Sequence, residues 1–220
     1  MTELPEISGP DRAPASGRPA RQLVVLLHGW GADGNDLIGL APQWAARLPD
    51  ARFVSPHAPD VCDANPNGRQ WFAFQNREPH EVMAGVRHAR AVIDRYLDTV
   101  LAEMGLAEDR LALAGFSQGA MMALDVALRR AAPCAAVISF SGRLLGADTL
   151  AGEIRARPPV FLAHGEADPV VPFAELADAV AVLGANDVAV RWHATPGLGH
   201  GIDPTGLEIA ADLLADTLGE

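Results

Sequence analysis

Gly-Phe-Ser-Gln-Gly, residues 115–119, is the stretch that decides the fold, because it places Ser117 between two glycines in the pattern G-x-S-x-G. The run 110–114 before it is short and apolar, as in a buried strand, and 118–131 after it has a helical pattern with a basic end. A serine in so sharp a turn adopts a strained backbone conformation, and glycines two residues away on either side prevent a collision. The motif predicts a nucleophilic serine on a strand-turn-helix elbow. Taken alone, it also fits an ordinary glycine-rich turn.

The composition indicates a single soluble globular domain. The chain has 220 residues, of which 49% are apolar and 20% charged, a length that suits one domain with a substantial core. It contains no apolar run long enough to cross a membrane and no basic and apolar segment of the secretory kind. We therefore expect a cytoplasmic protein without stable membrane insertion. A formal net charge of −11 argues against nucleic acid as a partner.

The basic residues and the cysteines exclude further classes of chemistry. All 17 basic residues are arginine, and the absence of lysine excludes a phosphate loop of the Walker type and Schiff-base catalysis. The two cysteines, Cys62 and Cys134, are too few and too far apart for a zinc site or a disulfide framework. We expect free thiols. A cysteine nucleophile is the alternative, although neither residue lies in an elbow-like turn.

Strands and helices alternate from residue 22 onward, with connections long enough for right-handed crossovers. This alternation predicts an α/β fold with a mostly parallel sheet and helices on both faces. Only residues 141–158 separate two of the strands, which leaves no room for a separate lid domain. The predicted strands are 22–27, 51–55, 110–114, 135–140, 159–163 and 187–194, and the predicted later helices are 80–104, 118–131, 173–183 and 206–218.

Two segments stand apart from this alternation. Residues 1–20 are rich in Pro, Gly, Ala and Ser and predict a disordered or loosely attached leader, with the domain itself at 21–220. Residues 56–79 are predicted to form a long irregular loop, which in a compact domain is usually functional or mobile. The first helix is expected to run to about residue 47 from a cap at Asn35 or Asp36.

A serine hydroxyl is a poor nucleophile until a base takes its proton, and that base must be oriented by a third group. His200 lies in a glycine-bracketed loop between the last strand and the last helix, and Asp168 follows the preceding strand. The carboxyl ends of parallel strands meet at one edge of the sheet, where ligands bind. The order Ser, Asp, His along the chain is that expected for an elbow nucleophile. We therefore predict that Ser117, Asp168 and His200 form a catalytic triad.

Other side chains compete for the roles of base and acid. His57, His80 and His193 are the alternative bases, and Glu166 and Asp187 are the alternative acids. His193 lies within a strand pattern, so the pleat sets its direction, and the other two histidines precede the elbow. Glu166 points away from the site if its turn is tight, and Asp187 is expected to start a strand.

Two further histidines, His28 and His164, each end a strand just before a glycine. They could be metal ligands, but no carboxylate lies at ligand spacing, which favours a structural role. We therefore expect no metal.

The loop after the first strand is glycine-rich, and acyl transfer needs backbone donors for a developing oxyanion. The N–H of Gln118, directly after the nucleophile, is one predicted donor, and the N–H of Trp30 in the loop 28–34 is the second. A plain strand-ending turn is the alternative for this loop.

Together these segments resemble the carboxylesterase and phospholipase family of α/β-hydrolases, which includes the acyl-protein thioesterases. The resemblance covers about residues 22–218, and it implies the α/β-hydrolase fold and an esterase or thioesterase without a cofactor. It also implies the triad and the two oxyanion donors named above. A relative of the dienelactone hydrolase type would carry cysteine at the nucleophile, where this chain has serine. The segments are LLHGWGADGNDL (26–37), WF (71–72), GFSQGAMMAL (115–124), HGEADPVVP (164–172) and GLGHGI (197–202).

The substrate is less constrained by the sequence. We expect Trp71 and Phe72 to border an acyl pocket, with simple packing as the alternative, and Leu144 and Leu145 are further candidates. Few aromatic residues (5%) and no lid domain predict an open, shallow site for short- to medium-chain esters or thioesters. A lysophospholipase, an acyl-protein thioesterase, another reaction on the same scaffold and a non-catalytic binding protein are the alternatives. The sequence leaves open whether the chain forms a homodimer.

Overall fold

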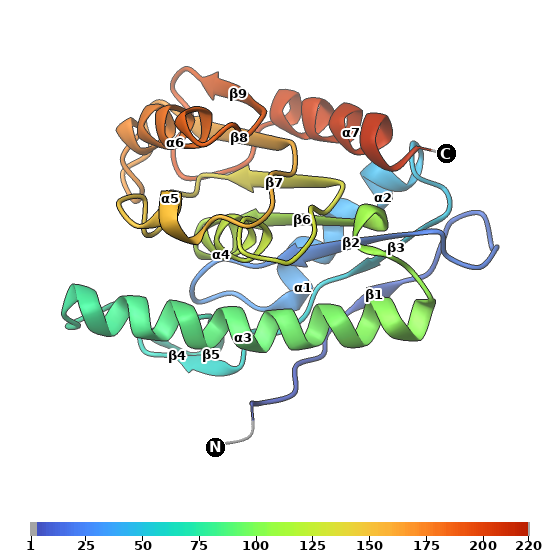
Figure 1. Cartoon of the computed structure of the whole chain (residues 1–220), viewed down its shortest axis with the longest axis horizontal. Helices are drawn as coiled ribbons and strands as arrows, with labels where there is room; N and C mark the ends of the chain where they lie inside the picture. Colours follow the sequence, from blue (N-terminus) through green and yellow to red (C-terminus); the bar gives the residue numbers. More distant parts are fainter. Residues whose placement is uncertain (1–3, 220) are drawn as a thin grey trace.

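The computed structural model describes residues 4–219, and in this range seven strands form one sheet. They are β1 (Asp11–Arg12), β2 (Gln22–Leu27), β3 (Ala51–Val54), β6 (Leu111–Phe116), β7 (Ala136–Phe140), β8 (Val160–Gly165) and β9 (Val190–Thr195). The strand order is β1-β3-β2-β6-β7-β8-β9, and all neighbours pair in parallel except β1 with β3. Figure 1 shows the strands following one another in this order across the molecule, from β9 to β1.

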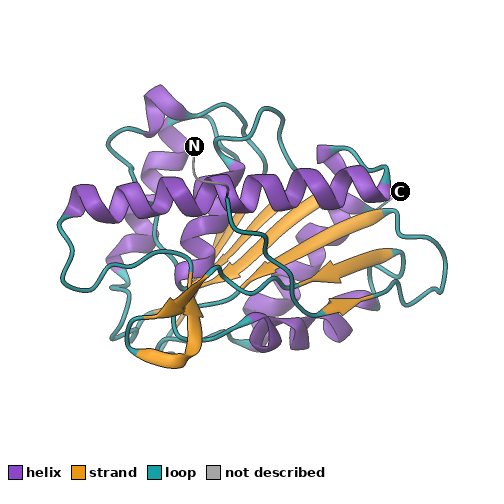
Figure 2. Cartoon of the chain, turned by 90° about the horizontal axis from the view of Figure 1, so that it is seen from below, coloured by secondary structure: helices purple, strands orange, loops and turns teal. Residues whose placement is uncertain are grey.

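Helices lie on both faces of the sheet, as predicted. They are α1 (Gly34–Leu37), α2 (Ala41–Ala45), α3 (Pro79–Met104), α4 (Gln118–Ala127), α5 (Leu150–Glu153), α6 (Ala174–Ala185) and α7 (Pro204–Leu218), with short 3-10 turns η1 (Ile38–Leu40) and η2 (Glu108–Arg110). One core forms where α3, α4 and α6 pack on the sheet, and the other lies beneath α2 and α7. Figure 2 shows the long helix α3 crossing one face of the sheet.

Strand β2 illustrates why the sheet is buried on both faces. Leu23, Val25 and Leu27 join the first core, whereas Val24 and Leu26 join the second, and all are fully buried. Successive side chains of a strand point to opposite faces, so a strand covered on both faces is apolar at every position.

The parallel order places the predicted site residues at one edge of the sheet. Ser117 follows β6, Asp168 follows β8 and His200 follows β9, and the loop that carries Trp30 follows β2. The carboxyl ends of parallel strands all lie at the same edge, where ligands of such sheets bind. No helix among residues 4–219 combines the length and apolar character needed to span a bilayer.

The described part of the predicted leader differs from the prediction, because it is packed against the sheet. Residues 11 and 12 pair with β3 as strand β1, and Ser8 and Pro10 accept backbone hydrogen bonds from His57 and Ser55, both at 2.9 Å. An edge strand has free backbone groups that a neighbouring segment can satisfy. The proline-rich composition concealed this pairing, and residues 1–3 lie outside the described range.

The first helix also differs from the prediction. Asp33, rather than Asn35 or Asp36, is the cap, and its side chain accepts a hydrogen bond from the Asn35 N–H at 2.8 Å. The helix is split into α1, η1 and α2. Pro42 lacks the N–H that would bond to the carbonyl of Ile38, so a single regular helix cannot run through this position.

The predicted irregular loop 56–79 contains a hairpin of β4 (Asp60–Cys62) and β5 (Asn65–Gln70). Strand β5 was not predicted, because its polar residues and Pro66 are typical of a loop. Arg69 of β5 exchanges backbone hydrogen bonds with Gly31 and Ala32 in the loop after β2, and no local pattern reveals these bonds. Figure 2 shows the hairpin beyond the carboxyl ends of the sheet strands.

Two further element boundaries differ from the prediction by more than two residues. Helix α4 ends at Ala127 rather than at residue 131, because Arg129 bonds to the carbonyl of Val126 in the tightened pattern of a last turn. Strand β9 starts at Val190, because Asp187 has φ 59° and lies in a left-handed turn.

Substitution of Gly9 tests whether the leader is packed. A Cβ at this position would lie 2.1 Å from the carbonyl oxygen of Ser55, so we expect Gly9→Val to lower the unfolding free energy. The cost of such overpacking is about 1–3 kcal/mol. Urea denaturation measures it, and Gly17→Asn is the control, since Gly17 has φ 70° with no described atom within 4 Å of a Cβ. Equal stability of Gly9→Val and wild type would contradict the packed leader.

Candidate active site

Ser117 occupies the predicted elbow between β6 and α4. Its backbone has φ 52° and ψ −117°, a region that non-glycine residues rarely adopt. The Ser117 N–H donates to the Phe140 carbonyl at 2.9 Å, which ties the turn to the neighbouring strand β7. A Cβ on Gly119 would lie 1.9 Å from the Leu27 carbonyl oxygen, and one on Gly115 would lie 2.4 Å from backbone atoms of Gly119. Only glycines permit this approach.

Asp168 and His200 meet directly, as the sequence predicts. The Nδ1 atom of His200 lies 2.7 Å from Oδ2 of Asp168, whose side chain is fully buried. The other carboxylate oxygen accepts hydrogen bonds from the backbone N–H groups of Val170 at 2.8 Å and Val171 at 2.9 Å. The acid is therefore held by backbone, and it in turn orients the ring of His200.

The ionisation of Asp168 follows from these contacts. Burial raises the pKa of the Asp168 carboxyl, but the hydrogen bonds from His200 and from the N–H groups of Val171 and Val170 outweigh it and leave the pKa below its ordinary value. An ionised carboxylate only accepts hydrogen bonds, so Nδ1 of His200 carries a proton. In the neutral form of the ring, the opposite nitrogen, Nε2, has a free lone pair that can accept a proton.

His164 contacts the same acid from the other side. Its Nε2 atom lies 2.9 Å from the Val171 carbonyl oxygen and 3.3 Å from Oδ2 of Asp168, and the residue is buried. The ring therefore packs against the Asp168 turn, a contact that the sequence did not indicate. Among residues 4–219, no group of three or more His, Cys, Asp or Glu side chains could hold a metal ion.

His28, the other candidate metal ligand, is buried in the wall behind the site. Its Nε2 atom accepts a hydrogen bond from the Ala58 N–H at 3.0 Å, so Nδ1 carries the proton and donates to the Gly29 carbonyl at 2.8 Å. Burial lowers the pKa of His28, which keeps the ring neutral.

The competing bases and acids lie apart from this constellation or bond elsewhere. His193 on β9 lies 3.4 Å from Asp203, the residue that caps α7, and His57 accepts a hydrogen bond from the Gly34 N–H. His80 and Glu166 are exposed, and Asp187 lies in the turn before β9.

A cavity of about 820 Å³ opens at the carboxyl edge of the sheet, and its walls are mainly apolar. Ser117, His200, Trp30 and Gln118 all line it, so the predicted nucleophile, base and oxyanion donors share one space. Of the predicted substrate-binding residues, Phe72, Leu144 and Leu145 line the cavity too.

Trp71 is the exception among the predicted pocket residues. It is 1% exposed and lies behind the cavity wall, where its indole N–H donates to the His28 carbonyl at 2.9 Å. The prediction that Trp71 and Phe72 both face an acyl group does not fit this geometry for Trp71. Both residues lie in a bend directly after β5, and of the two only Phe72 lines the cavity.

Sequence reasoning missed several apolar wall residues. Met121 lies one turn after Ser117 on α4, a spacing that places both residues on the same face of the helix. This signal was available in the sequence. Val82 and Met83, at the start of α3, also line the cavity, but nothing in the sequence linked that helix to the site.

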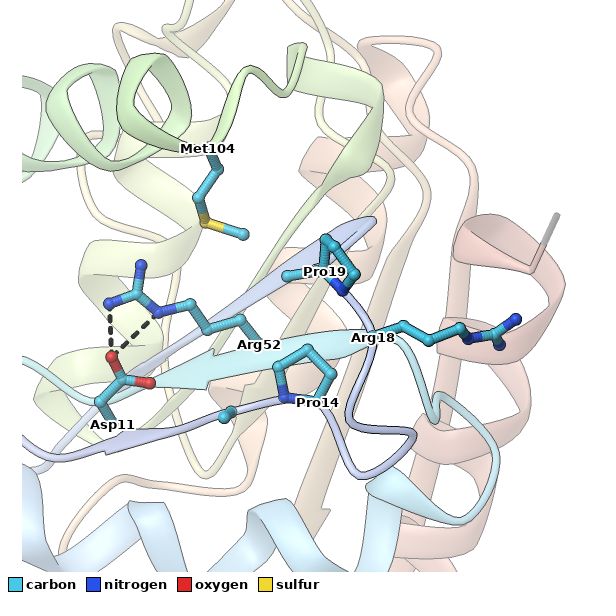
Figure 3. Close-up of a pocket in the computed structure, with 8 residues that line it drawn as sticks. Asp11, Pro14, Arg18, Pro19, Arg52 and Met104 are labelled. Carbon is cyan, nitrogen blue, oxygen red and sulfur yellow. Dashed lines mark hydrogen bonds and ion pairs between the residues drawn. The ribbon is translucent and has the colours of Figure 1, made fainter.

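A second hollow, of about 560 Å³, lies between the leader and the end of α3 (Figure 3). Asp11 and Arg52 form an ion pair in its wall, and Met104 and two prolines line it as well. No serine, cysteine or histidine lines this hollow. The larger cavity is therefore the one that combines space with the predicted nucleophile and the predicted base.

The fold and the elbow define an α/β-hydrolase, and comparisons with known proteins narrow the class. The sequence model of the Phospholipase/Carboxylesterase family matches residues 12–218. The chain therefore belongs to the phospholipase/carboxylesterase family.

Named relatives and a solved structure agree with this assignment. Esterase YpfH of Escherichia coli strain K12 is 33% identical over 207 residues, covering 91% of this chain and 85% of that protein. Acyl-protein thioesterase 1 of Neurospora crassa is 28% identical, covering 89% of this chain and 86% of that protein. The crystal structure of esterase PE8 is 41% identical with a TM-score of 0.92, covering 97% of this chain and all of that one.

Replacement of Asp168 by asparagine tests the electrostatics of the pair with His200. At neutral pH we expect Asp168→Asn to lower the unfolding free energy by about 2 kcal/mol, because charge-assisted hydrogen bonds to a buried carboxylate are lost. The native pKa of Asp168 lies below 3.8, so this stabilisation is complete above that value and disappears as the pH falls through the native pKa. Urea denaturation at a series of pH values should show that the unfolding free energies of wild type and Asp168→Asn become equal only in strong acid. Asp178→Asn on the exposed side of α6 is the control, and a constant gap down to about pH 2 would contradict the assignment.

Proposed function

We propose that this protein is a serine hydrolase that cleaves carboxylic esters or thioesters through an acyl-enzyme. The observation that carries the proposal is the His200–Asp168 hydrogen bond of 2.7 Å beside a cavity that Ser117 also lines. Membership of the phospholipase/carboxylesterase family supports a hydrolase, and the names of the relatives include both esterases and thioesterases.

The proposed reaction is of the ping-pong type. The Ser117 hydroxyl attacks the acyl carbonyl while Nε2 of His200 takes its proton, and the imidazolium is stabilised by ionised Asp168. Collapse of the tetrahedral intermediate breaks the bond to the alcohol or thiol, which leaves with the proton from His200. Water then repeats the sequence on the acyl-enzyme, and the carboxylic acid is released.

The oxyanion of each tetrahedral intermediate needs donors that are already in place. We assign this role to the backbone N–H groups of Gln118 and Trp30. Gln118 is the first residue of α4, and the N–H groups at the start of a helix have no partner within the helix. The positive end of the helix dipole adds to the stabilisation of negative charge there.

The acyl chain would occupy the apolar cavity between Phe72, Met121 and Leu144. We propose short- to medium-chain acyl groups and retain lysophospholipase and acyl-protein thioesterase activity as alternatives. A non-catalytic binding protein on the same scaffold is the alternative from another class. Cytoplasmic location and the absence of a nucleic-acid partner remain parts of this proposal.

The nucleophile is tested by Ser117→Ala. We expect turnover of p-nitrophenyl esters to fall by about four to six orders of magnitude, because no other group can form the acyl-enzyme. Ser55→Ala is the control: Ser55 is fully buried, donates to the Leu26 carbonyl at 3.1 Å and does not line the cavity. A fluorophosphonate probe should label wild type and Ser55→Ala only. Failure to label wild type would favour the binding-protein alternative.

Chain-length preference is tested with a series of p-nitrophenyl esters and acyl-CoA thioesters. We expect kcat/KM to be greatest for short and medium chains, since these fit the cavity beside Ser117 completely. A sharp optimum at long chains would contradict the proposed preference without affecting the proposed chemistry. The ratio of the two series at equal chain length separates an esterase from a thioesterase.

A further inference from the structure

The loop that carries Trp30 is bound to the β4–β5 hairpin along its length. The Gly31 N–H donates to the Arg69 carbonyl at 2.9 Å, and the Arg69 N–H donates to the Ala32 carbonyl at 2.7 Å. The indole N–H of Trp30 donates to the side chain of Gln70 at 2.9 Å. The backbone on the C-terminal side of the Trp30 amide is therefore held by the hairpin.

His28 holds the same amide from the other side. The Trp30 N–H shares a peptide plane with the Gly29 carbonyl, and in a trans peptide the two point in opposite directions. Because Nδ1 of His28 donates to that carbonyl at 2.8 Å, the direction of the Trp30 N–H follows from the position of the histidine.

Trp71 connects this arrangement to the nucleophile elbow. Its ring lies against His28 with centroids 5.3 Å apart, and its indole N–H donates to the His28 carbonyl at 2.9 Å. The Gln118 side chain accepts from the Trp71 N–H at 2.8 Å and donates to the Phe72 carbonyl at 2.7 Å. Gln118 itself is 2% exposed.

These bonds join the two amides to which the proposed function assigns the oxyanion. One path runs from Trp30 through His28 to Trp71, and the Gln118 side chain closes it onto the residue that carries the second amide. An oxyanion hole works only when its donors lie about 2.7–3.1 Å from the developing charge, so their separation must be held closely. Trp71 does not line the cavity and so cannot act by binding substrate.

We propose that Trp71 and the side chain of Gln118 are positioning residues that set the separation and direction of the Trp30 and Gln118 amides. This inference rests on the proposed function of the same site. It assigns to Trp71 a role in transition-state stabilisation rather than in acyl-chain recognition. It also gives the Gln118 side chain a role separate from that of its backbone N–H.

The chain contains matched controls for both residues. Trp44 is as buried as Trp71 and likewise donates its indole N–H to a backbone carbonyl, that of Leu207 at 3.3 Å, but it lies in the second core. Gln22 is buried and donates to the Leu218 carbonyl at 3.0 Å, far from the cavity. Substitution of Trp44 removes a comparable buried ring, substitution of Gln22 removes a buried amide, and neither touches the oxyanion loop.

The experiment compares Trp71→Phe with Trp44→Phe, and Gln118→Met with Gln22→Met, in the full chain. Steady-state hydrolysis gives kcat and KM, and an aliphatic trifluoromethyl ketone reports on the oxyanion hole. Serine adds to the ketone carbonyl, its proton passes to histidine, and the adduct places an oxyanion between the two amides. Thermal unfolding of each variant measures the structural cost separately.

We expect Trp71→Phe and Gln118→Met to lower kcat by about 10- to 100-fold, somewhat less than the loss of a whole donor, with KM little changed. The inhibition constant of the ketone should rise by the same factor. Trp44→Phe should lose stability, and both control variants should keep wild-type kcat and ketone affinity.

Three results would overturn the inference. They are an unchanged kcat in Trp71→Phe and Gln118→Met, a lower kcat with unchanged ketone affinity, and an equal loss in the control variants. If Trp71→Phe does not fold, the Gln118→Met variant tests the inference by itself, because it keeps Trp71 and the backbone amide of residue 118. The proposed function would instead be refuted if wild type neither hydrolysed esters nor reacted with a fluorophosphonate. That result concerns wild type alone, so it is distinct from any result obtained with the variants.

Discussion

The strained backbone of Ser117 is the constraint on which the rest of the site depends. A non-glycine residue at φ 52° and ψ −117° costs about 1–3 kcal/mol and persists only where its surroundings leave no alternative. Here the Ser117 N–H is bonded to β7, and Gly119 lets α4 begin in contact with the end of β2. The helix start, the loop after β2 and the serine hydroxyl are consequently brought to one point by packing, before any substrate is present.

Asp168 and His200, the proposed acid and base, are held by a second, independent set of interactions. Two backbone N–H groups hold one oxygen of Asp168, and His200 and His164 both lie against the other. Backbone donors lose little entropy on bonding, since the fold has already ordered them. The direction of the His200 ring therefore depends on the turn after β8. None of the hydrogen bonds described for Ser117 joins the elbow to this turn.

Much of this arrangement could be predicted from the sequence, because it depends on local patterns. Buried parallel strands such as β2 read as continuous apolar runs, and the elbow glycines have a steric cause that the motif displays. The order of Ser117, Asp168 and His200 then follows from the alternation of strands and helices.

The features that could not be predicted from the sequence depend on pairing between distant segments. Strand β1 exists because β3 has a free edge, and β5 exists because the loop after β2 bonds to it. The segments around Trp71 in the sequence predict that it lies beside the site. Its contacts with Gln118 and His28, which are distant in the sequence, decide that it lies behind the cavity wall.

The hairpin has a consequence for how such a protein can change over time. It lies outside the main sheet, and it contacts the loop that carries Trp30 through backbone atoms and the side chains of Asn65 and Gln70. The residues that follow it, from Phe72 to the start of α3, form part of the cavity wall. The proposed acyl-binding wall and the proposed charge-stabilising loop are thus adjacent in the chain, and they meet at two residues: the Gln118 side chain donates to the Phe72 carbonyl, and the Trp30 ring packs on Phe74. A lineage built on this plan can vary the wall residues at 77–83 to accept new acyl groups without touching the hydrogen bonds that hold the Trp30 and Gln118 amides.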